Sequence, residues 1–224
     1  RETERQKFGL EMIASENYSS LAVQQAMGNL LTDKYSEGYP HHRFYAGCDN
    51  IDIVEDEAVT YAKTLFKADH AYVQPHSGAD ANLVAFWSIL VQRVQNKEVE
   101  RLQKKSVDEL TPAEYEAVRQ LMLKQKILGM TLNSGGHLTH GYRHNVSSKM
   151  MQAIGYDIDP ATGLLDYDKI AAQAKEEKPD ILLAGYSAYP RLINFAKMKE
   201  IANSIGAVFM VDMAHFAGLV AGGA

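Results

Sequence analysis

Residues 207–215 read Ala-Val-Phe-Met-Val-Asp-Met-Ala-His, so that five apolar residues end in Asp212 and an imidazole, His215, follows three positions later. An unbroken apolar run of this kind is typical of a parallel strand that is buried on both faces. Ligands of open α/β sheets lie beyond the carboxyl ends of such strands, which is where Asp212 stands. Because a buried carboxylate is costly without a partner, we expect a cationic or hydrogen-bonding group beside Asp212. The alternative is that Asp212 only caps the loop that follows.

Upstream of this strand, apolar strands alternate with amphipathic helices. Helices are expected at 51–66, from Gly78 to Leu90, at 166–177 and at 194–204, and strands at 70–74, 127–132, 179–185 and 207–212. This order predicts an α/β fold with a mostly parallel sheet that is covered by helices on both sides.

Residues 92–126 are rich in Glu, Lys, Gln and Arg, and we interpret them as a solvated helical hairpin inserted into the fold. Thr111 can cap a helix there, Pro112 suits the first helical position, and Glu114 completes a capping box.

The composition excludes several classes of protein. The net charge of −5 is spread over interspersed acidic and basic residues, so we expect no nucleic-acid partner and no membrane partner. No run is long enough to span a bilayer, and the N-terminus lacks the apolar stretch of a signal peptide. The one cysteine, Cys48, rules out an internal disulfide and suits a reducing compartment, so we expect a buried, inert thiol in a cytoplasmic protein. Because the chain starts without Met and stops at Ala224, directly after a strand, we expect a fragment or a partly ordered chain.

Polar clusters follow several of the expected strands. Residues 75–80, Pro-His-Ser-Gly-Ala-Asp, open a helix whose free N–H groups could bind a phosphate, although the segment considered alone is more typical of an ordinary capped helix start. In residues 135–141, Gly-Gly-His-Leu-Thr-His-Gly, the glycines permit close approach of a ligand, and His137 could stack on a flat cofactor ring. Three histidines nearby, without a supporting carboxylate pattern, are a weak metal signal, so we expect no metal.

Ser187 directly follows the strand that ends at Gly185, in a sequence close to the nucleophile elbow of serine hydrolases. Asp212 and His215 come later in the chain order that such enzymes use. Tyr189 replaces the second glycine of the elbow, so we keep a serine hydrolase only as an alternative hypothesis. Upstream, residues 35–48 combine aromatic, Gly and Pro residues with one carboxylate and one guanidinium, which is typical of a functional or irregularly packed loop.

Together these segments resemble serine hydroxymethyltransferase, a fold-type I pyridoxal-phosphate enzyme. The motifs that carry the resemblance occur in the order of that family: Ile13–Tyr18, Lys34–Pro40, His76–Gly78, Gly135–Gly141, Ser187–Tyr189 and Val211–Leu219. They span nearly the whole chain apart from residues 92–126. The resemblance implies that the chain is part of the large domain of such an enzyme.

The resemblance also implies a site for pyridoxal phosphate. Asp212 would keep the pyridine nitrogen protonated, so that the ring withdraws electrons from the substrate's α-carbon, and His137 would stack on the ring. Ser187 and His215 would bond the polar edge of the ring. Ser77, Gly78 and Ala79 would hold the phosphate, and Tyr35 would be a further cofactor contact.

The substrates implied are serine, glycine and tetrahydrofolate. Ser15 would bind the amino-acid carboxylate, and Glu37 would transfer a proton near the serine hydroxyl. The neighbouring subunit's site would be reached by Tyr35, Glu37 and Tyr45, which implies an obligate homodimer. The folate would contact Leu132, Gly136 and Leu138.

The chain departs from the family pattern at three positions: Ala79 replaces a common hydroxyl residue, Ser134 a common histidine and Phe44 a common tyrosine. We expect these departures to affect the affinity for the cofactor's phosphate and for folate. The resemblance further implies that the Schiff-base lysine, the carboxylate-binding arginine and the small C-terminal domain lie beyond residue 224, so we expect the 224 residues alone to be inactive.

The domain prediction is an N-terminal segment at 1–50, carrying the dimer and active-site loop, and an incomplete cofactor-binding domain at 51–224 with the insertion at 92–126. The implied reaction converts serine and tetrahydrofolate into glycine and methylenetetrahydrofolate. A threonine aldolase would share Asp212 and His137 without needing the folate positions, and a non-catalytic scaffold would bind no cofactor.

Overall fold

The computed structural model describes residues 1–13 and 15–223, so Ala14 of the first motif and Ala224 of the predicted second domain lie outside it. The chain forms two compact units. The first unit comprises residues 1–75 and 216–224, and the second comprises residues 76–215. The predicted division at residue 50 stays a prediction. Within the described ranges, no helix has both the length and the apolar character that crossing a membrane requires.

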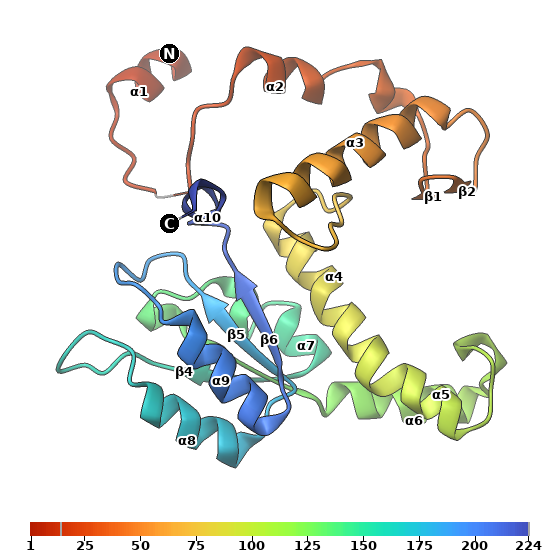
Figure 1. Ribbon diagram of the computed structural model, residues 1–224, viewed down its shortest axis with the longest axis vertical. Helices are drawn as coiled ribbons and strands as arrows, with labels where there is room; N and C mark the ends of the chain where they lie inside the picture. Colours follow the sequence, from red (N-terminus) through yellow and green to blue (C-terminus); the bar gives the residue numbers. More distant parts are fainter. Residues whose placement is uncertain (14, 224) are drawn as a thin grey trace. The chain divides into compact units, whose positions relative to one another are not determined.

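The second unit is built on a parallel sheet with strand order β4-β3-β5-β6 (Figure 1). Its strands are β3 (Lys126–Met130), β4 (Gln152–Tyr156), β5 (Ile181–Gly185) and β6 (Val208–Asp212). The predicted strands at 179–185 and 207–212 are confirmed. The strand predicted at 127–132 ends at Met130, because a 3₁₀ turn begins at Leu132.

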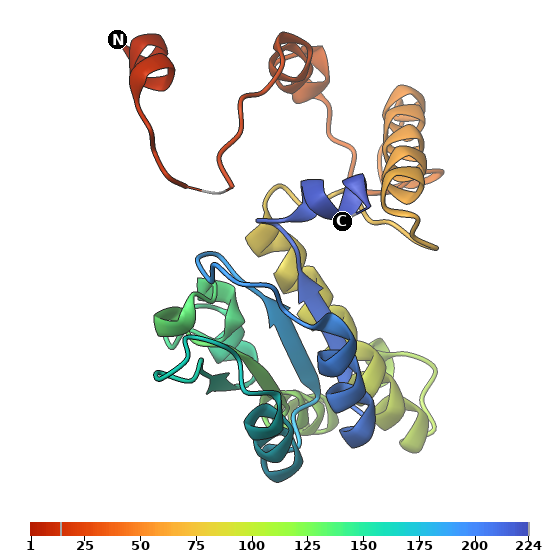
Figure 2. The ribbon, with the colours of Figure 1, turned by 60° about the vertical axis from the view of Figure 1, so that its left-hand side comes forward.

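Helices cover both faces of this sheet, which confirms the predicted α/β fold (Figure 2). Successive side chains of a strand point to opposite faces. Leu128 and Leu182 therefore pack on one side, with α8 (Tyr167–Glu177) and α9 (Phe195–Ile205). The neighbouring strand residues Ile127 and Ile181 pack on the other side, with α4 (Gly78–Leu90), the π-helical turn η2 (Val91–Gln95) and α6 (Pro112–Leu123).

The segment 92–126 is helical, as predicted, with α5 (Asn96–Arg101) and the 3₁₀ turn η3 (Val107–Glu109) ahead of α6. The capping box is confirmed. Thr111 N–H donates to Glu114 Oε2 (2.8 Å), and Glu114 N–H donates to Thr111 Oγ1 (3.3 Å). The expectation of a solvated hairpin is wrong on one face, because Val118 and Met122 are buried in the core against α4.

Two further expectations about strands were wrong or incomplete. Residues 70–74 form no strand, and the Gln74 side chain instead donates to Gly38 O (2.9 Å) and Glu55 Oε1 (2.7 Å). Conversely, β4 was not predicted, because its sequence Gln-Ala-Ile-Gly-Tyr is short and has only one β-branched residue. The remaining elements of this unit are η4 (Leu132–Ser134), η5 (Leu138–His140) and α7 (Ser147–Met150).

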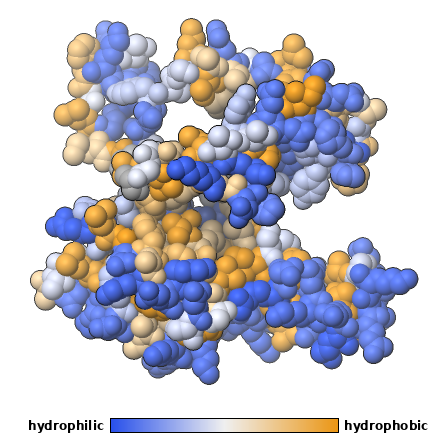
Figure 3. All heavy atoms as spheres, in the orientation of Figure 1, coloured by the Kyte–Doolittle hydropathy of each residue, from blue (hydrophilic) through white to orange (hydrophobic). Residues whose placement is uncertain are grey.

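The first unit contains the predicted helix 51–66, which is α3 (Asp49–Phe66). Its other elements are α1 (Glu2–Phe8), α2 (Leu21–Met27), the 3₁₀ turn η1 (Leu30–Asp33), the two-residue strands β1 (Gly38–Tyr39) and β2 (His42–Arg43), and α10 (Ala217–Gly222). No residue of α1 or α2 is buried, and hydrophobic side chains of this N-terminal segment are exposed (Figure 3).

Candidate functional site

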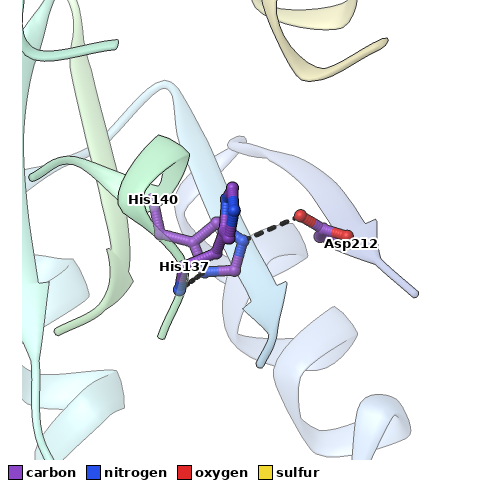
Figure 4. A group of neighbouring side chains, drawn as sticks. All are labelled: His137, His140 and Asp212. Carbon is purple, nitrogen blue, oxygen red and sulfur yellow. Dashed lines mark hydrogen bonds and ion pairs between the residues drawn. The ribbon is translucent and has the colours of Figure 1, made fainter. Parts of the chain in front are cut away.

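Asp212 is the last residue of β6, and its register partner is Gly185, the last residue of β5. The carboxylate therefore lies at the carboxyl edge of the sheet, as predicted. The expected hydrogen-bonding partners are present. His140 Nε2 lies 3.0 Å from Asp212 Oδ2 (Figure 4). Asn82 Nδ2 donates to the same oxygen at 2.8 Å. Asp212 Oδ1 accepts the N–H of Ala214 (3.2 Å), so Asp212 also caps the following turn. The expected partners and the capping contact are therefore both present, and the role of Asp212 toward a cofactor stays a prediction.

Asp212 is held as a carboxylate. Its partial burial raises the pKa, but the hydrogen bonds from His140, Asn82 and the Ala214 N–H outweigh the burial and bring the pKa far below its usual range. The negative charge is therefore kept throughout the physiological pH range, in a position where it can face a cationic group.

His140, which is buried, has a defined proton position. Its Nδ1 accepts the backbone N–H of His137 (3.2 Å), so a neutral ring carries its proton on Nε2, toward Asp212 (Figure 4). His137 is half-buried, and its Nδ1 accepts the N–H of Thr139 (3.2 Å). Burial lowers the pKa of His137, and neighbouring His140 lowers it further. We therefore expect His137 to be neutral at physiological pH.

His137, His140 and Asp212 bring three potential metal-ligand atoms within 4.8 Å of one another. Metal binding requires a free lone pair on each imidazole. His140 could offer Nε2 only by moving its proton to Nδ1, which faces the N–H of His137. The arrangement therefore favours hydrogen bonding over metal coordination.

The loops after β3 and β5 are joined through Gly135. Its carbonyl accepts the N–H groups of Ser187 (2.8 Å) and Ala188 (3.0 Å). A Cβ at Gly136 would lie 2.0 Å from Met130 O. Gly136 is therefore needed for the close approach of the chain's own backbone, and the access of a ligand to this loop stays a prediction.

Ser187 Oγ and His215 Nδ1 are buried, and neither has a hydrogen-bond partner within the described part of the chain. Buried polar atoms are nearly always paired, so these two point to a polar group that would complete the site. The serine-hydrolase hypothesis is not supported. Ser187 makes no hydrogen bond to His215, and Asp212 orients His140 rather than His215.

The expected phosphate loop forms a capped helix start. Ser77 is the N-cap of α4, and its Oγ accepts the N–H of Asp80 (3.1 Å). Gly78 and Ala79 are the first two residues of the helix and are exposed. Their N–H groups have no partner within the helix, which leaves them available to an anion. The phosphate-binding role stays a prediction.

The positions implied for folate differ in exposure: Leu132 and Leu138 are exposed, and Gly136 is buried. A cavity of about 320 Å³ is lined in part by Leu132 and His137. The departure Ser134 is buried, donates to Asp157 Oδ1 (2.8 Å) and accepts the N–H of Ile158 (3.0 Å). The folate roles stay predictions.

The other predicted site residues belong to the first unit: Ser15, Tyr35, Glu37 and Tyr45. All four are exposed, and the rings of Tyr35 and Tyr45 meet edge to face with centroids 5.7 Å apart. Their loop is held by the buried Arg43 side chain, which donates to Asp52 Oδ1 (2.8 Å) and Glu55 Oε2 (2.7 Å). Cys48 is buried beside this loop, as predicted.

Sequence reasoning missed the roles of Asn82, Thr139 and His140 beside Asp212. An amide within the mostly apolar helix Gly78–Leu90 was the available signal for Asn82, because a buried amide needs a partner. Thr139 and His140 stood within a motif already singled out for His137.

Comparison with known proteins was consistent along the whole chain. The family model described as serine hydroxymethyltransferase matches residues 1–100 and 94–224. A serine hydroxymethyltransferase from Treponema pallidum is 60% identical over 218 residues, which are 97% of this chain and 38% of that protein. One from Mycolicibacterium smegmatis is 56% identical over 99% of this chain and 45% of its own length. One from Chlamydia trachomatis is 57% identical over 100% of this chain and 45% of its own length. The chain thus spans less than half the length of these relatives.

Proposed function

Because the chain belongs to the serine hydroxymethyltransferase family, we propose that the intact protein transfers the hydroxymethyl carbon of serine to tetrahydrofolate and releases glycine. The observation that carries the proposal in this chain is the ionised Asp212 at the carboxyl edge of the sheet. No feature of the described residues favours a hydrolase or an aldolase over this reaction.

Pyridoxal phosphate fits the residues that are present. The unpartnered Ser187 Oγ and His215 Nδ1 are suited to the polar edge of its ring, and Asp212 is suited to its nitrogen. When bound, the group supplies a protonated ring that withdraws electrons from the substrate's α-carbon. Asp212 would hold the proton on that ring, and His137 would stack against it. Ser77, Gly78 and Ala79 would hold the phosphate at the start of α4.

The remaining roles follow the family resemblance. Ser15 would bind the substrate carboxylate, and Glu37 would move a proton at the serine hydroxyl. Tetrahydrofolate would contact Leu132, Gly136 and Leu138. Tyr35 would contact the cofactor and Tyr45 would act in catalysis, both in the neighbouring subunit of a homodimer. The exposed apolar residues of the N-terminal segment support such an interface, among them Phe8, Leu10, Met12 and Met27. The single free cysteine is consistent with a cytoplasmic location of the protein.

The proposal is tested by Asp212→Asn in the intact protein. We expect kcat/KM for serine with tetrahydrofolate to fall by about 10²-fold or more, because the amide cannot hold the ring proton by charge. Asp168→Asn, at an exposed position on α8, is the matched control and should leave the rate unchanged. An Asp212→Asn protein with the rate of the wild type would refute the proposal. Serine cleavage that continued at full rate without tetrahydrofolate would favour an aldolase instead.

A further inference from the structure

Asn82 lies in the second turn of α4 and is only 6% exposed. Its Nδ2 atom donates to Thr139 Oγ1 (2.8 Å) and to Asp212 Oδ2 (2.8 Å). An amide nitrogen has two hydrogens and no acceptor capacity, so both bonds run outward from Asn82. One side chain therefore contacts both the carboxylate and the loop that carries His137.

The Thr139 hydroxyl can both accept and donate, and its role toward His137 follows from the backbone: His137 Nδ1 already accepts a backbone N–H, so the hydroxyl donates to that nitrogen. Thr139 Oγ1 accepts from Asn82, and its own hydrogen is directed at its other neighbour, His137 Nδ1, at 2.8 Å. The backbone N–H of Thr139 donates to the same nitrogen (3.2 Å). With two donors directed at it, His137 Nδ1 has no place for a proton, so the neutral ring carries its proton on Nε2.

We infer that Asn82 and Thr139 are positioning residues: together they set the proton of His137 on Nε2, oppose a second proton on Nδ1, and bond the carboxylate of Asp212 through the same amide. Thr139 is 2% exposed, so water does not replace its hydroxyl in this chain of bonds.

The consequence for the site rests on the proposed function. A protonated His137 would place a positive charge against a ring that Asp212 is proposed to keep positive, and like charges repel. A neutral His137 stacks without that cost. The ionisable groups that act on His137 are His140 and His215, which oppose its protonation, and Asp212, which favours it. The hydrogen bonds that Thr139 donates to His137 Nδ1 also oppose the protonation of His137.

The experiment measures the His137 ring directly, in the intact protein labelled with ¹⁵N-histidine and prepared without cofactor. Two-dimensional NMR assigns the proton to Nδ1 or Nε2, and a pH titration gives the pKa, with the signals of His137 identified by their loss in His137→Gln. We expect the Nε2–H form in the wild type. Thr139→Val should raise the pKa of His137 by about 0.5 to 1 unit, because one donor to Nδ1 is lost. Asn82→Leu should shift it in the same direction, and Thr139→Ser should restore the wild-type value.

Ser147→Ala is the matched control, since Ser147 is also fully buried in this unit and donates only to Asn145 Oδ1 (3.1 Å). It should leave the His137 pKa unchanged even if it lowers stability. A wild-type proton on Nδ1 would overturn the inference, and so would a shift in Thr139→Val no larger than that in Ser147→Ala. If one of the variants Thr139→Val and Asn82→Leu does not fold, the pKa shift of His137 in the other decides. Because no cofactor or turnover is involved, this result is independent of whether the proposed reaction is correct.

Discussion

Gly185 shows how one residue determines the shape of the site. It has a φ of +128° and is the register partner of Asp212. A Cβ built at Gly185 would lie 2.1 Å from the carbonyl oxygen of Asp212. The end of β6 can therefore approach β5 only because this position has no side chain. The placement of Asp212 therefore depends on that approach in addition to its own hydrogen bonds.

We predict that Gly185→Ala lowers the free energy of unfolding by about 3 kcal/mol or more, since backbone strain and a steric clash add together. Gly206→Ala is the control. Gly206 also has a positive φ, +71°, but a Cβ there meets nothing within 4 Å. Gly206→Ala should lower the free energy of unfolding by only about 1–2 kcal/mol, because the left-handed backbone conformation is the only feature that opposes a side chain there. Urea unfolding of both variants makes the comparison, and equal losses would contradict the steric argument.

Helix α6 illustrates how a segment with a charged, surface-like composition can still contribute to the core. Its capping box makes the helix start at Pro112, which sets the face that later residues present. Val118 and Met122 lie four residues apart and are therefore on one face of the helix. Both are buried against Leu90 and Ile127. The hairpin is thus part of the domain's packing, while its opposite face stays charged.

We therefore predict that Met122→Ala destabilises the second unit by about 2–5 kcal/mol, the usual range for a buried Met-to-Ala change. Met122 is 4% exposed. Met27 is 80% exposed in the single chain, so Met27→Ala is a control of the same chemistry in the monomer, where it should change the free energy of unfolding by no more than about 0.5 kcal/mol. Thermal or urea unfolding measures both. A loss for Met122→Ala as small as that for Met27→Ala would mean that the hairpin is solvated on all sides.

Stability is unevenly distributed over the molecule. Nearly all buried apolar residues within the described ranges belong to the second unit, and the exceptions are Cys48 and Phe216. The first unit relies instead on the Arg43 ion pairs and on a long α3. Its N-terminal helices have no buried residues of their own. Local opening should therefore be easiest at the N-terminus.

Hydrogen–deuterium exchange should show this difference. We predict that amides of the central strands β3 and β5 exchange slowest, close to the rate set by global unfolding, and that amides of α1 and α2 exchange near the rate of an unfolded chain in the monomer. Dilution to a monomer should speed exchange in α1 and α2 if the proposed homodimer covers them. Equal protection of the two units in the monomer would show that the N-terminal segment is stabilised within its own subunit.

Much of the fold could be predicted from the sequence because the patterns that mark its strands and helices are local. The apolar run before Asp212 marks a buried strand, the three- and four-residue spacing from Ile51 marks α3, and Thr111 with Glu114 marks the start of α6. The need of a buried carboxylate for a partner also follows from Asp212 alone. Each of these inferences depends on neighbours in the chain and on a periodicity of two or 3.6 residues.

The sequence did not identify the partners of Asp212, because they depend on contacts between distant residues. Asn82 is 130 residues from Asp212, and His140 is 72 residues from it. His140 reaches Asp212 because the parallel strands β3, β5 and β6 end at the same edge of the sheet, and Asn82 reaches it from α4, which packs on one face of that sheet. The failure of residues 70–74 to form a strand, and the presence of β4, have the same origin. Strand pairing and buried hydrogen bonds are properties of the assembled sheet, and no local pattern specifies which distant groups it will place together.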